Sequence, residues 1–357
     1  MSSWAALPPY IGKYNLGHTI GKGSFSLVKE GQDTDTRAKY AVKIIPKSNM
    51  STAQELERFE REVRVILKMD HPGIIKIHDF LVDASFFYLI MELCSGDTLI
   101  KQTPPPGTIN EGSSKPIFKQ ILEVINYIHD QGIAHRDLKL ENVLIDPQGH
   151  IKLIDFGFSR FAESGQMFAT PCGSPAYAAP EVIGGSQYDG KAADMWSCGV
   201  LLFCLVTGEL PWKQGNQVHV MTQIQKGSFE MPEGLSTFCA DLISKLLQPD
   251  PLMRLTAVEA IKHPWIEGIE VSWEMNKGIT PVISEKSFVK ILTSSGNNFA
   301  TTSPRSMLKM LGTRQNKKPP QSGSMSFGPK TPAPMPHSMI KLAGPIVPMK
   351  RDVLRPP

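Results

Sequence analysis

Three oxygen-bearing side chains, those of Asp137, Asn142 and Asp155, lie close together in the sequence and suit one kind of chemistry. The stretch from Asn142 to Asp155, NVLIDPQGHIKLID, reads as two short apolar strands around a Pro-Gln-Gly turn. Such a hairpin would hold the three side chains at one rim. Carboxylate and amide oxygens bind hard cations and orient hydroxyl groups, so this stretch predicts phosphoryl transfer.

A glycine-containing turn near the N-terminus could bring backbone N–H groups to a phosphate. The stretch YNLGHTIGKGSFSLVKEGQD alternates as two strands do around Gly21 and Gly23, and Phe25 could cover the loop. A strand is predicted at 27–30, where a dinucleotide-binding fold would need a helix. An ordinary β-turn is the alternative interpretation of this signal when it is taken alone.

One charged residue, Lys43, interrupts the apolar strand KYAVKII. Its ammonium group either reaches solvent or is held by an anion. The next segment predicts a helix with Ser51 as its N-cap and Gln54 completing a capping box. An apolar stripe at helical spacing over residues 59–67 predicts the buried face of this helix.

The second half of the chain predicts mainly helices. The expected helices span 115–132, 216–226, 236–247 and 256–262. A further helix, expected to open at Asp194, is apolar on nearly every side and is therefore predicted to be buried.

The composition is that of an ordinary globular chain with a charged tail. Of 357 residues, 41% are hydrophobic and 20% charged, which allows two domains or one large two-lobed domain with a tail. Residues 301–357 hold ten Lys or Arg and one acid, a net of +9, and because the whole chain carries +4, the remainder carries −5. We expect neither nucleic acid nor membrane as a partner.

The cysteines and the N-terminus indicate a compartment. There are five cysteines without a CxxC pair, which is typical of a reducing environment. The N-terminal residues MSSWAALPPYIGKY lack a charged region followed by an apolar run, so we predict no signal peptide. The longest apolar run, 199–206, is too short to span a bilayer. We expect a cytoplasmic protein, with the nucleus as the alternative.

Taken together, these motifs resemble the eukaryotic protein kinase family. HRDLKLEN at 135–142, IDFG at 154–157 and APE at 179–181 follow the glycine loop and the AVK lysine in the family's order. The resemblance covers 14–266 and implies an α+β, bilobal fold. We expect an N-lobe at 14–93 with a small antiparallel sheet and one helix, and a mainly helical C-lobe at 94–266. The remaining chain would be an N-terminal extension, 1–13, and a mostly disordered, basic tail, 267–357.

The resemblance implies a role for each polar residue of the central stretch. Asp137 would accept or orient the proton of the substrate hydroxyl, and Lys139 would steady the transferred phosphate, as in serine/threonine kinases. Asn142 and Asp155 would hold Mg²⁺. Ser174 would hydrogen-bond to Asp137 and Lys139. His135 and Phe156 are expected to pack in the core, not to take part in the chemistry.

The resemblance also implies a site for ATP. Lys43 would contact the α- and β-phosphates and pair with Glu62 of the following helix, and Met91 would stand behind the adenine pocket. The backbone of 92–94 would bind adenine. The residues expected to contact the nucleotide are Ile20, Gly21, Lys22, Gly23, Ser24, Phe25, Ser26, Val28, Ala41, Lys43, Glu62, Met91, Glu92, Cys94 and Asp155. The segment 101–114, KQTPPPGTINEGSS, departs from the family's pattern and predicts a loop.

An activation mechanism follows from the same resemblance. Arg136 precedes the catalytic aspartate, and in the family this arginine binds a phosphate on the activation loop. Thr170 occupies the position of that phosphothreonine, and Arg160 is a second candidate partner. Glu181 is expected to pair with Arg254.

The branch within the family is predicted from two motifs. HPW at 263–265 closes the domain as in the calcium/calmodulin-dependent and AMP-activated kinases, and CGSPAYAAPEV is similar to the AMP-activated branch and the testis-specific serine kinases. We therefore predict a member of the calcium/calmodulin-dependent group that uses ATP and Mg²⁺. Its partners would be protein substrates and an upstream activating kinase.

The tail leaves several interpretations open. A helix is predicted near 284–292, and its residues Phe288, Ile291 and Leu292 would either dock on the kinase or belong to a transient helix. The basic and apolar residues of 305–314 suit an autoinhibitory or calmodulin-binding helix, and a disordered, solvated tail is the favoured alternative.

Two other functions compete with that of a protein kinase. A pseudokinase acting as a binding scaffold would be expected to lack Lys43, Asp137 or Asp155, and all three are present. A kinase for small molecules is disfavoured by GSPAYAAPE and by the full set of helices expected in the C-lobe.

Overall fold

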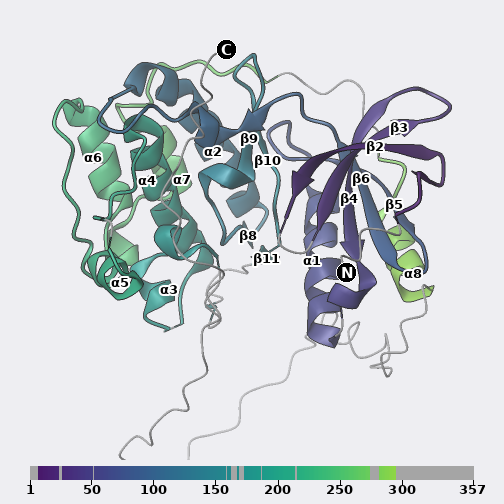
Figure 1. Ribbon diagram of the computed structural model, residues 1–357. Coiled ribbons are helices and arrows are strands. Elements are labelled where there is room, and N and C mark those ends of the chain that lie inside the picture. The colour runs from purple at the N-terminus through teal and green to yellow at the C-terminus, as the bar shows by residue number, and fades with distance from the viewer. Residues whose placement is uncertain are drawn as a thin grey trace, which may run out of the picture. The chain divides into compact units, whose positions relative to one another are not determined.

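A six-stranded antiparallel sheet, in the order β1-β2-β3-β4-β6-β5, forms the N-lobe of the computed structural model (Figure 1). The strands are β1 (Tyr10–Ile11), β2 (Tyr14–Lys22), β3 (Leu27–Asp33), β4 (Lys39–Pro46), β5 (Ile77–Val82) and β6 (Phe86–Glu92). The sheet begins within the predicted N-terminal extension, because Tyr10 pairs with Asn15. The structure describes residues 7–23, 26–50, 52–157, 159–161, 167–168, 173–185, 187–213, 215–273 and 281–294, all within one compact unit.

The two faces of this sheet carry different sets of side chains. Cross-strand register places Val28 opposite Lys43 and Ala41 opposite Met91, and because side chains alternate along a strand, these four share one face. The other face forms an apolar cluster of its own. Its buried members are Tyr14, Tyr40, Val42, Ile44, Phe86, Tyr88 and Ile90. Alternation along β3 and β4, together with the pairing of β4 with the distant strand β6, thus brings four of the predicted nucleotide-contacting residues to one face.

Helix α1 (Ala53–Lys68) packs on the sheet face that carries Lys43. The ring centroids of Phe59 on α1 and Phe87 on β6 lie 5.2 Å apart. The helix begins one residue later than predicted, because Thr52 is the N-cap and Glu55 completes the capping box. The Glu55 carboxylate accepts hydrogen bonds from both the Thr52 N–H and its hydroxyl at 2.9 Å, which Gln54 cannot provide from its position.

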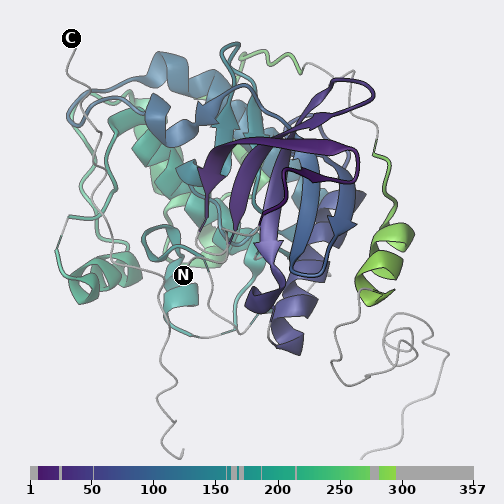
Figure 2. The same cartoon turned by 45° about the vertical axis from the view of Figure 1, so that its right-hand side comes forward.

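The C-lobe is helical, as predicted, with short strands near the sheet. Its helices are α2 (Glu111–Asp130), α3 (Pro180–Ile183), α4 (Gly190–Thr207), α5 (Gln217–Lys226), α6 (Thr237–Leu246) and α7 (Ala257–Ile261). Its strands are β7 (Asp97–Thr98), β8 (Ile133–Ala134), β9 (Val143–Ile145), β10 (Ile151–Leu153) and β11 (Arg160–Phe161). Figure 2 shows the same structure turned by 45° about the vertical axis. Among the described helices, α4 alone is long and apolar enough to cross a membrane, but 89% of it is buried inside the protein. It is the central helix of this core.

The start of α2 differs from the prediction. The segment 101–114 was expected to be a loop, whereas a 3₁₀ helix occupies Leu99–Gln102 and α2 begins at Glu111. Asn110 supplies the cap, since its side chain accepts a hydrogen bond from the Ser113 N–H. Pro116 therefore lies inside the helix, about one turn further along than the pattern suggested.

The chain after residue 266 continues onto the domain. Helix α8 (Glu285–Ser294) confirms the helix predicted near 284–292, and it lies against α1 and β5. Phe288 and Leu292 are buried, as the docking interpretation required. The basic patch at 305–314 lies outside the described residues.

Candidate active site

The hairpin predicted between the two catalytic motifs is present and sets the site's geometry. Strands β9 and β10 pair antiparallel with Val143 opposite Leu153, and the Ile154 N–H continues the pairing by donating to the Asn142 carbonyl at 3.0 Å. Asn142 immediately precedes β9 and Asp155 follows Ile154, so the hairpin brings these two side chains to the same end.

Asp137 is the centre of a hydrogen-bond network. Its Oδ1 accepts from the Ser174 N–H at 2.9 Å and from the Ser174 hydroxyl at 3.1 Å. Its Oδ2 accepts from Lys139 Nζ at 2.9 Å and from Asn142 Nδ2 at 3.1 Å. Lys139 Nζ also lies 2.9 Å from the Ser174 hydroxyl, which confirms the predicted contacts of Ser174. Hydrogen-bond donors to both oxygens fix the orientation of the Asp137 carboxylate, and its negative charge attracts the Lys139 ammonium group.

A buried aspartate, Asp194, holds the backbone of the loop that carries Asp137. Asp194 is fully buried and accepts from the backbone N–H groups of His135 at 2.8 Å and Arg136 at 2.7 Å. These bonds hold Arg136 in a left-handed backbone conformation with φ of 69°, which a non-glycine residue adopts only when its surroundings enforce it. The prediction that a helix opens at Asp194 is wrong, because α4 begins at Gly190 with Asp189 as its N-cap.

Lys43 and Glu62 form the predicted ion pair, with 2.9 Å between Nζ and Oε1. Burial acts to lower the pKa of Lys43, but the carboxylates of Glu62 and Asp155 outweigh it and the pKa is raised. Burial likewise acts to raise the pKa of Asp155, yet the Lys43 ammonium and the Gly157 N–H hold it below its usual value. Lys43 and Asp155 therefore stabilise each other's charged forms.

The glycine loop connects β2 and β3 at the edge of this face. The Gly23 N–H donates to the Ser26 carbonyl at 2.9 Å, and a Cβ on Gly23 would lie 2.9 Å from the Ser26 hydroxyl oxygen. Glycine is thus needed at Gly23 for a close approach and not for a positive φ. The side chain of Ile20 on β2 is exposed. Ser24 and Phe25 lie outside the described residues.

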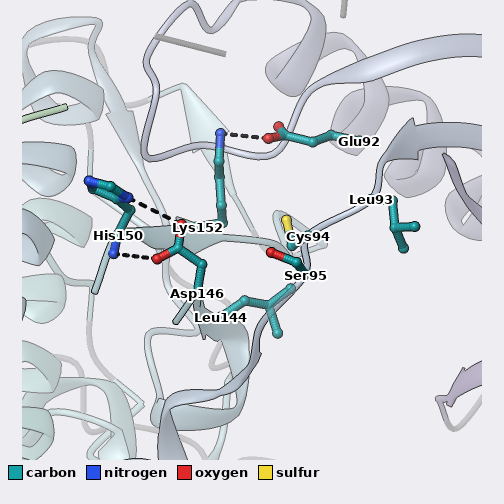
Figure 3. Close-up of a pocket in the computed structure, with 8 residues that line it drawn as sticks. All are labelled: Glu92, Leu93, Cys94, Ser95, Leu144, Asp146, His150 and Lys152. Atoms are coloured by element: carbon teal, nitrogen blue, oxygen red, sulfur yellow. Dashed lines mark hydrogen bonds and ion pairs between the residues drawn. The ribbon is translucent and has the colours of Figure 1, made fainter. Parts of the chain in front are cut away.

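The predicted hinge lies beside a small pocket between the lobes (Figure 3). The Glu92 carboxylate bonds to Lys152 Nζ at 2.8 Å and accepts from the Lys76 N–H at 3.3 Å. The Glu92 N–H in turn donates to the Lys76 carbonyl at 2.9 Å. Burial raises the pKa of Cys94 to about 12, and its thiol is therefore protonated and unreactive near neutral pH. Asp97, which follows the hinge, pairs with Lys101 at 2.6 Å.

The pocket also identifies a residue that the motifs did not. Its lining consists of Glu92, Leu93, Cys94, Ser95, Leu144, Asp146, His150 and Lys152 (Figure 3). Leu144 is the half-buried middle residue of β9, between two buried neighbours, so its side chain lies on the opposite face of the strand from theirs. An apolar side chain beside the hinge suits a flat aromatic base. In the sequence it reads as one apolar strand residue among several.

Arg136, the predicted phosphate ligand, is held by two aromatic residues far away in the sequence. Its Nε and Nη2 donate to the Tyr188 hydroxyl at 3.0 and 2.5 Å, and its guanidinium lies 4.5 Å from the ring centroid of Phe168. Thr170 lies outside the described residues, as does the side chain of Arg160. The backbone of Arg160 pairs with Ala134 of β8, two residues before Arg136.

The side-chain oxygens of Asn142 and Asp155, at the end of the β9–β10 hairpin, suit a Mg²⁺ ion that is also bound to nucleotide phosphates. The Asn142 amide nitrogen is engaged by Asp137, and one Asp155 oxygen accepts from Gly157, which leaves hard oxygen atoms of Asn142 and Asp155 as ligands. In the described part of the chain, no three His, Cys, Asp or Glu side chains gather as a metal site. Mg²⁺ needs only one or two protein ligands when phosphates supply the others, and it then neutralises charge on the transferred group.

Fold and site together define a two-lobed phosphotransferase scaffold. Comparison with known families agrees, since the model of the protein kinase domain matches residues 14–266. The chain therefore belongs to the protein kinase family.

Three plant proteins are among its curated relatives. CBL-interacting serine/threonine-protein kinases 17 and 1 of Arabidopsis thaliana are 38% and 39% identical over 261 residues, which is 72% of this chain and 60% and 59% of theirs. CBL-interacting protein kinase 24 of Oryza sativa subsp. japonica is 36% identical over 258 residues, 72% of this chain and 57% of its own. The matched region thus spans less than two thirds of each relative.

Proposed function

We propose that this chain is an active serine/threonine protein kinase that transfers the γ-phosphate of ATP to hydroxyl groups of protein substrates. The observation that carries the proposal is the simultaneous presence of two assemblies: the Lys43–Glu62 pair in the N-lobe and the Asp137 network in the C-lobe. A pseudokinase scaffold would have no use for both. The similarity to named serine/threonine kinases supports the same conclusion.

The proposed mechanism assigns positioning and charge to the protein. The Asp137 carboxylate, which Ser174 and Asn142 hold in place, accepts the proton of the substrate hydroxyl through Oδ2 or orients that proton. Lys139, already shared between Asp137 and Ser174, places its positive charge on the transferred phosphate. Lys43 holds the α- and β-phosphates while Glu62 fixes its direction. Little covalent assistance is required, because the barrier falls mainly through alignment and charge stabilisation.

The branch of the family remains a proposal. We propose the calcium/calmodulin-dependent group on the strength of HPW at 263–265 and CGSPAYAAPEV alone, since the three relatives above are named for interaction with CBL. Since the match covers only 57% to 60% of those relatives, we extend to this chain their catalytic activity and not the partner in their names.

A direct test offers two kinds of acceptor to the purified full chain with radiolabelled ATP. One set is a degenerate library of serine- and threonine-containing peptides, and the other is a mixture of small metabolites with hydroxyl groups. We expect label in the peptides. Label confined to metabolites would contradict the proposal, and ATP binding without transfer to either set would favour the pseudokinase.

Activation through Thr170 gives a second prediction. Replacing Thr170 by alanine is expected to lower the turnover number about tenfold, because a phosphate there would form charge-assisted hydrogen bonds with Arg136. The measurement is the peptide phosphorylation rate of parent and variant, with mass spectrometry of the parent to quantify phosphate on Thr170. Thr222→Ala, an exposed threonine of α5, is the control. A full rate in Thr170→Ala, with Thr170 phosphorylated in the parent, contradicts this control mechanism.

A further inference from the structure

The chain that follows the kinase domain is fastened to both lobes. Lys119 on α2 donates to the Ile269 carbonyl, and the Trp273 indole N–H donates to Glu123 on the same helix at 2.8 Å. The Trp273 ring lies 4.9 Å from that of His71, in the loop that follows α1. A Cβ on Gly73 would lie 2.7 Å from this indole, so the loop and the indole are closely packed.

Helix α8 then packs on the N-lobe, where it contacts α1 and β5. Figure 1 shows it next to β5. Phe288 is fully buried, with ring centroids 4.8 Å from Phe80 on β5 and 6.2 Å from Phe59 on α1. Phe59 in turn stacks on Phe87 of β6 at 5.2 Å. Phe288 thus completes an aromatic cluster that joins α8, α1 and the sheet, and edge-to-face contacts of this kind add to the effect of burial.

Polar contacts fix the direction of α8 on this surface. Glu285 Oε1 lies 2.7 Å from Arg64 Nε on α1. The backbone N–H groups of Val282 and Ile283 donate to the His78 carbonyl at 2.8 and 3.3 Å. The segment before α8 is therefore anchored next to β5, and the start of α8 is anchored to α1.

These contacts act on the helix that carries Glu62. Phe59 and Glu62 are three residues apart on α1, so their side chains point about 60° apart around the helix axis. Glu62 holds Lys43 on one side of α1, while Phe59 meets Phe288 and Arg64 meets Glu285 at neighbouring positions. An outward or rotational shift of α1 would break the Lys43–Glu62 pair, and it would also have to break the contacts of α1 with Phe288 and Glu285.

We propose that α8 is a positioning element for the phosphoryl transfer, in which Phe288 and Glu285 hold α1 where Glu62 reaches Lys43. This inference rests on the kinase activity proposed above. The C-terminal segment would then support activity directly, and anything that removes α8 from α1 would lower it. The tail beyond residue 294 would gain a means of regulation, because it continues from the helix that controls Glu62.

The main test measures the ATP dependence of peptide phosphorylation in full-length variants. Phe288→Ala is expected to lower kcat/KM for ATP about tenfold, and Phe288→Leu to recover most of it. Phe118→Ala removes an equally buried phenylalanine from α2 in the C-lobe and controls for lost stability, so its kcat/KM per folded molecule should stay within about twofold of the parent.

A double variant shows whether Phe288 acts through Glu62. In a Glu62→Gln background, Phe288→Ala should cost less than about twofold, because the pair that α8 positions is already lost. An undiminished tenfold cost in that background, or parental kinetics in Phe288→Ala alone, overturns the inference. An inactive parent chain would instead refute the proposed function.

Charge reversal gives a test that leaves the aromatic cluster intact. Arg64 and Glu285 are each about one-third exposed, at 32%, so reversing them should not prevent folding. Arg64→Glu and Glu285→Arg are each expected to lower kcat/KM for ATP severalfold. The double reversal should restore part of it, because Glu60 and Lys68, which also pair with Arg64 and Glu285, then meet like charges. Equal activity in all four chains would mean that the ion pair does not position α1 and would contradict its assigned role.

Discussion

Replacing Asp155 by alanine is expected to lower the turnover number about a thousandfold or more. The substitution removes the carboxylate that would hold the cation beside the transferred phosphate. It leaves the 2.9 Å ion pair between Lys43 and Glu62 in place, so the N-lobe part of the nucleotide site should persist. KM for ATP should therefore change less than kcat. Initial rates of peptide phosphorylation over a range of ATP concentrations separate the two parameters.

The charge on Asp155 also determines which pH range is informative. Its pKa lies below the ordinary value because Lys43 and the Gly157 N–H outweigh the effect of burial, so its contribution to stability is present above the unfolded pKa and is lost as pH falls through the folded pKa. The raised pKa of Lys43 acts in the opposite sense, with a contribution lost only as pH rises through that value. Between about pH 5 and about pH 10 both groups stay charged. Neither should produce a limb of the pH–rate profile there.

A surface variant serves as the control that separates the lower turnover number of Asp155→Ala from damage to the fold. Asp130→Ala removes an exposed aspartate at the end of α2 and should retain the parental rate. The Asp155→Ala chain loses the attraction between Asp155 and Lys43, so its melting temperature is measured beside that of the parent and the rates are compared per folded molecule. A turnover number within tenfold of the parent, in a folded Asp155→Ala chain, would show that this carboxylate does not hold the cation.

Most of the candidate site could be predicted because its geometry is local. Asn142 and Asp155 meet across one short hairpin, and Asp137 reaches Asn142 within a single loop. Lys43 shares a sheet face with Val28 through ordinary strand alternation. In each case the sequence spacing and a standard element fix the distance. Glu62 was less local, since its assignment depended on the resemblance to a family and not on the helix pattern alone.

The parts that the sequence did not predict depend on tertiary contacts between distant segments. Tyr188 and Phe168 surround Arg136, but nothing in their neighbours marks them as its partners. Trp273 lies in a segment with an ambiguous pattern, and only the fold shows that it packs on the loop after α1. The start of α2 was missed for a different reason. Asn110 follows three prolines and a glycine, which made a loop the better local interpretation.

The ion pair between Glu181 and Arg254 illustrates a third case, in which a contact was predicted but its energetic weight was not. The Arg254 side chain is completely buried, and it forms two bonds with Glu181, at 2.9 and 3.2 Å. It also donates to the carbonyls of Ala192 at 2.6 Å and Gln248 at 2.9 Å, and its guanidinium lies 5.2 Å from the ring centroid of Trp196. One side chain therefore joins the end of the activation segment to α4 and to the loop after α6.

Arg254→Ala is accordingly expected to destabilise the protein by about 3–5 kcal/mol, because Glu181 and the carbonyl groups lose a partner they cannot replace with water. For a domain of this size the melting temperature should fall by roughly 10 °C or more. Arg254→Lys should recover only part of the loss, since an ammonium group cannot reach all of these acceptors in the plane of the guanidinium fork. Thermal melting of the full-length variants, followed by circular dichroism, measures both effects.

A matched arginine shows that burial, and not charge pairing as such, causes the effect. Arg61 pairs with Glu57 at 2.6 Å on exposed turns of α1, and Arg61→Ala should cost no more than about 0.5 kcal/mol. The double substitution Glu181→Leu with Arg254→Met removes both charges and should be less harmful than Arg254→Ala alone, because no buried carboxylate is left unpaired. If Arg254→Ala and Arg61→Ala have the same melting temperature, the buried ion pair contributes no more to stability than the surface ion pair. The activation segment must then be held to the C-lobe by its apolar contacts alone.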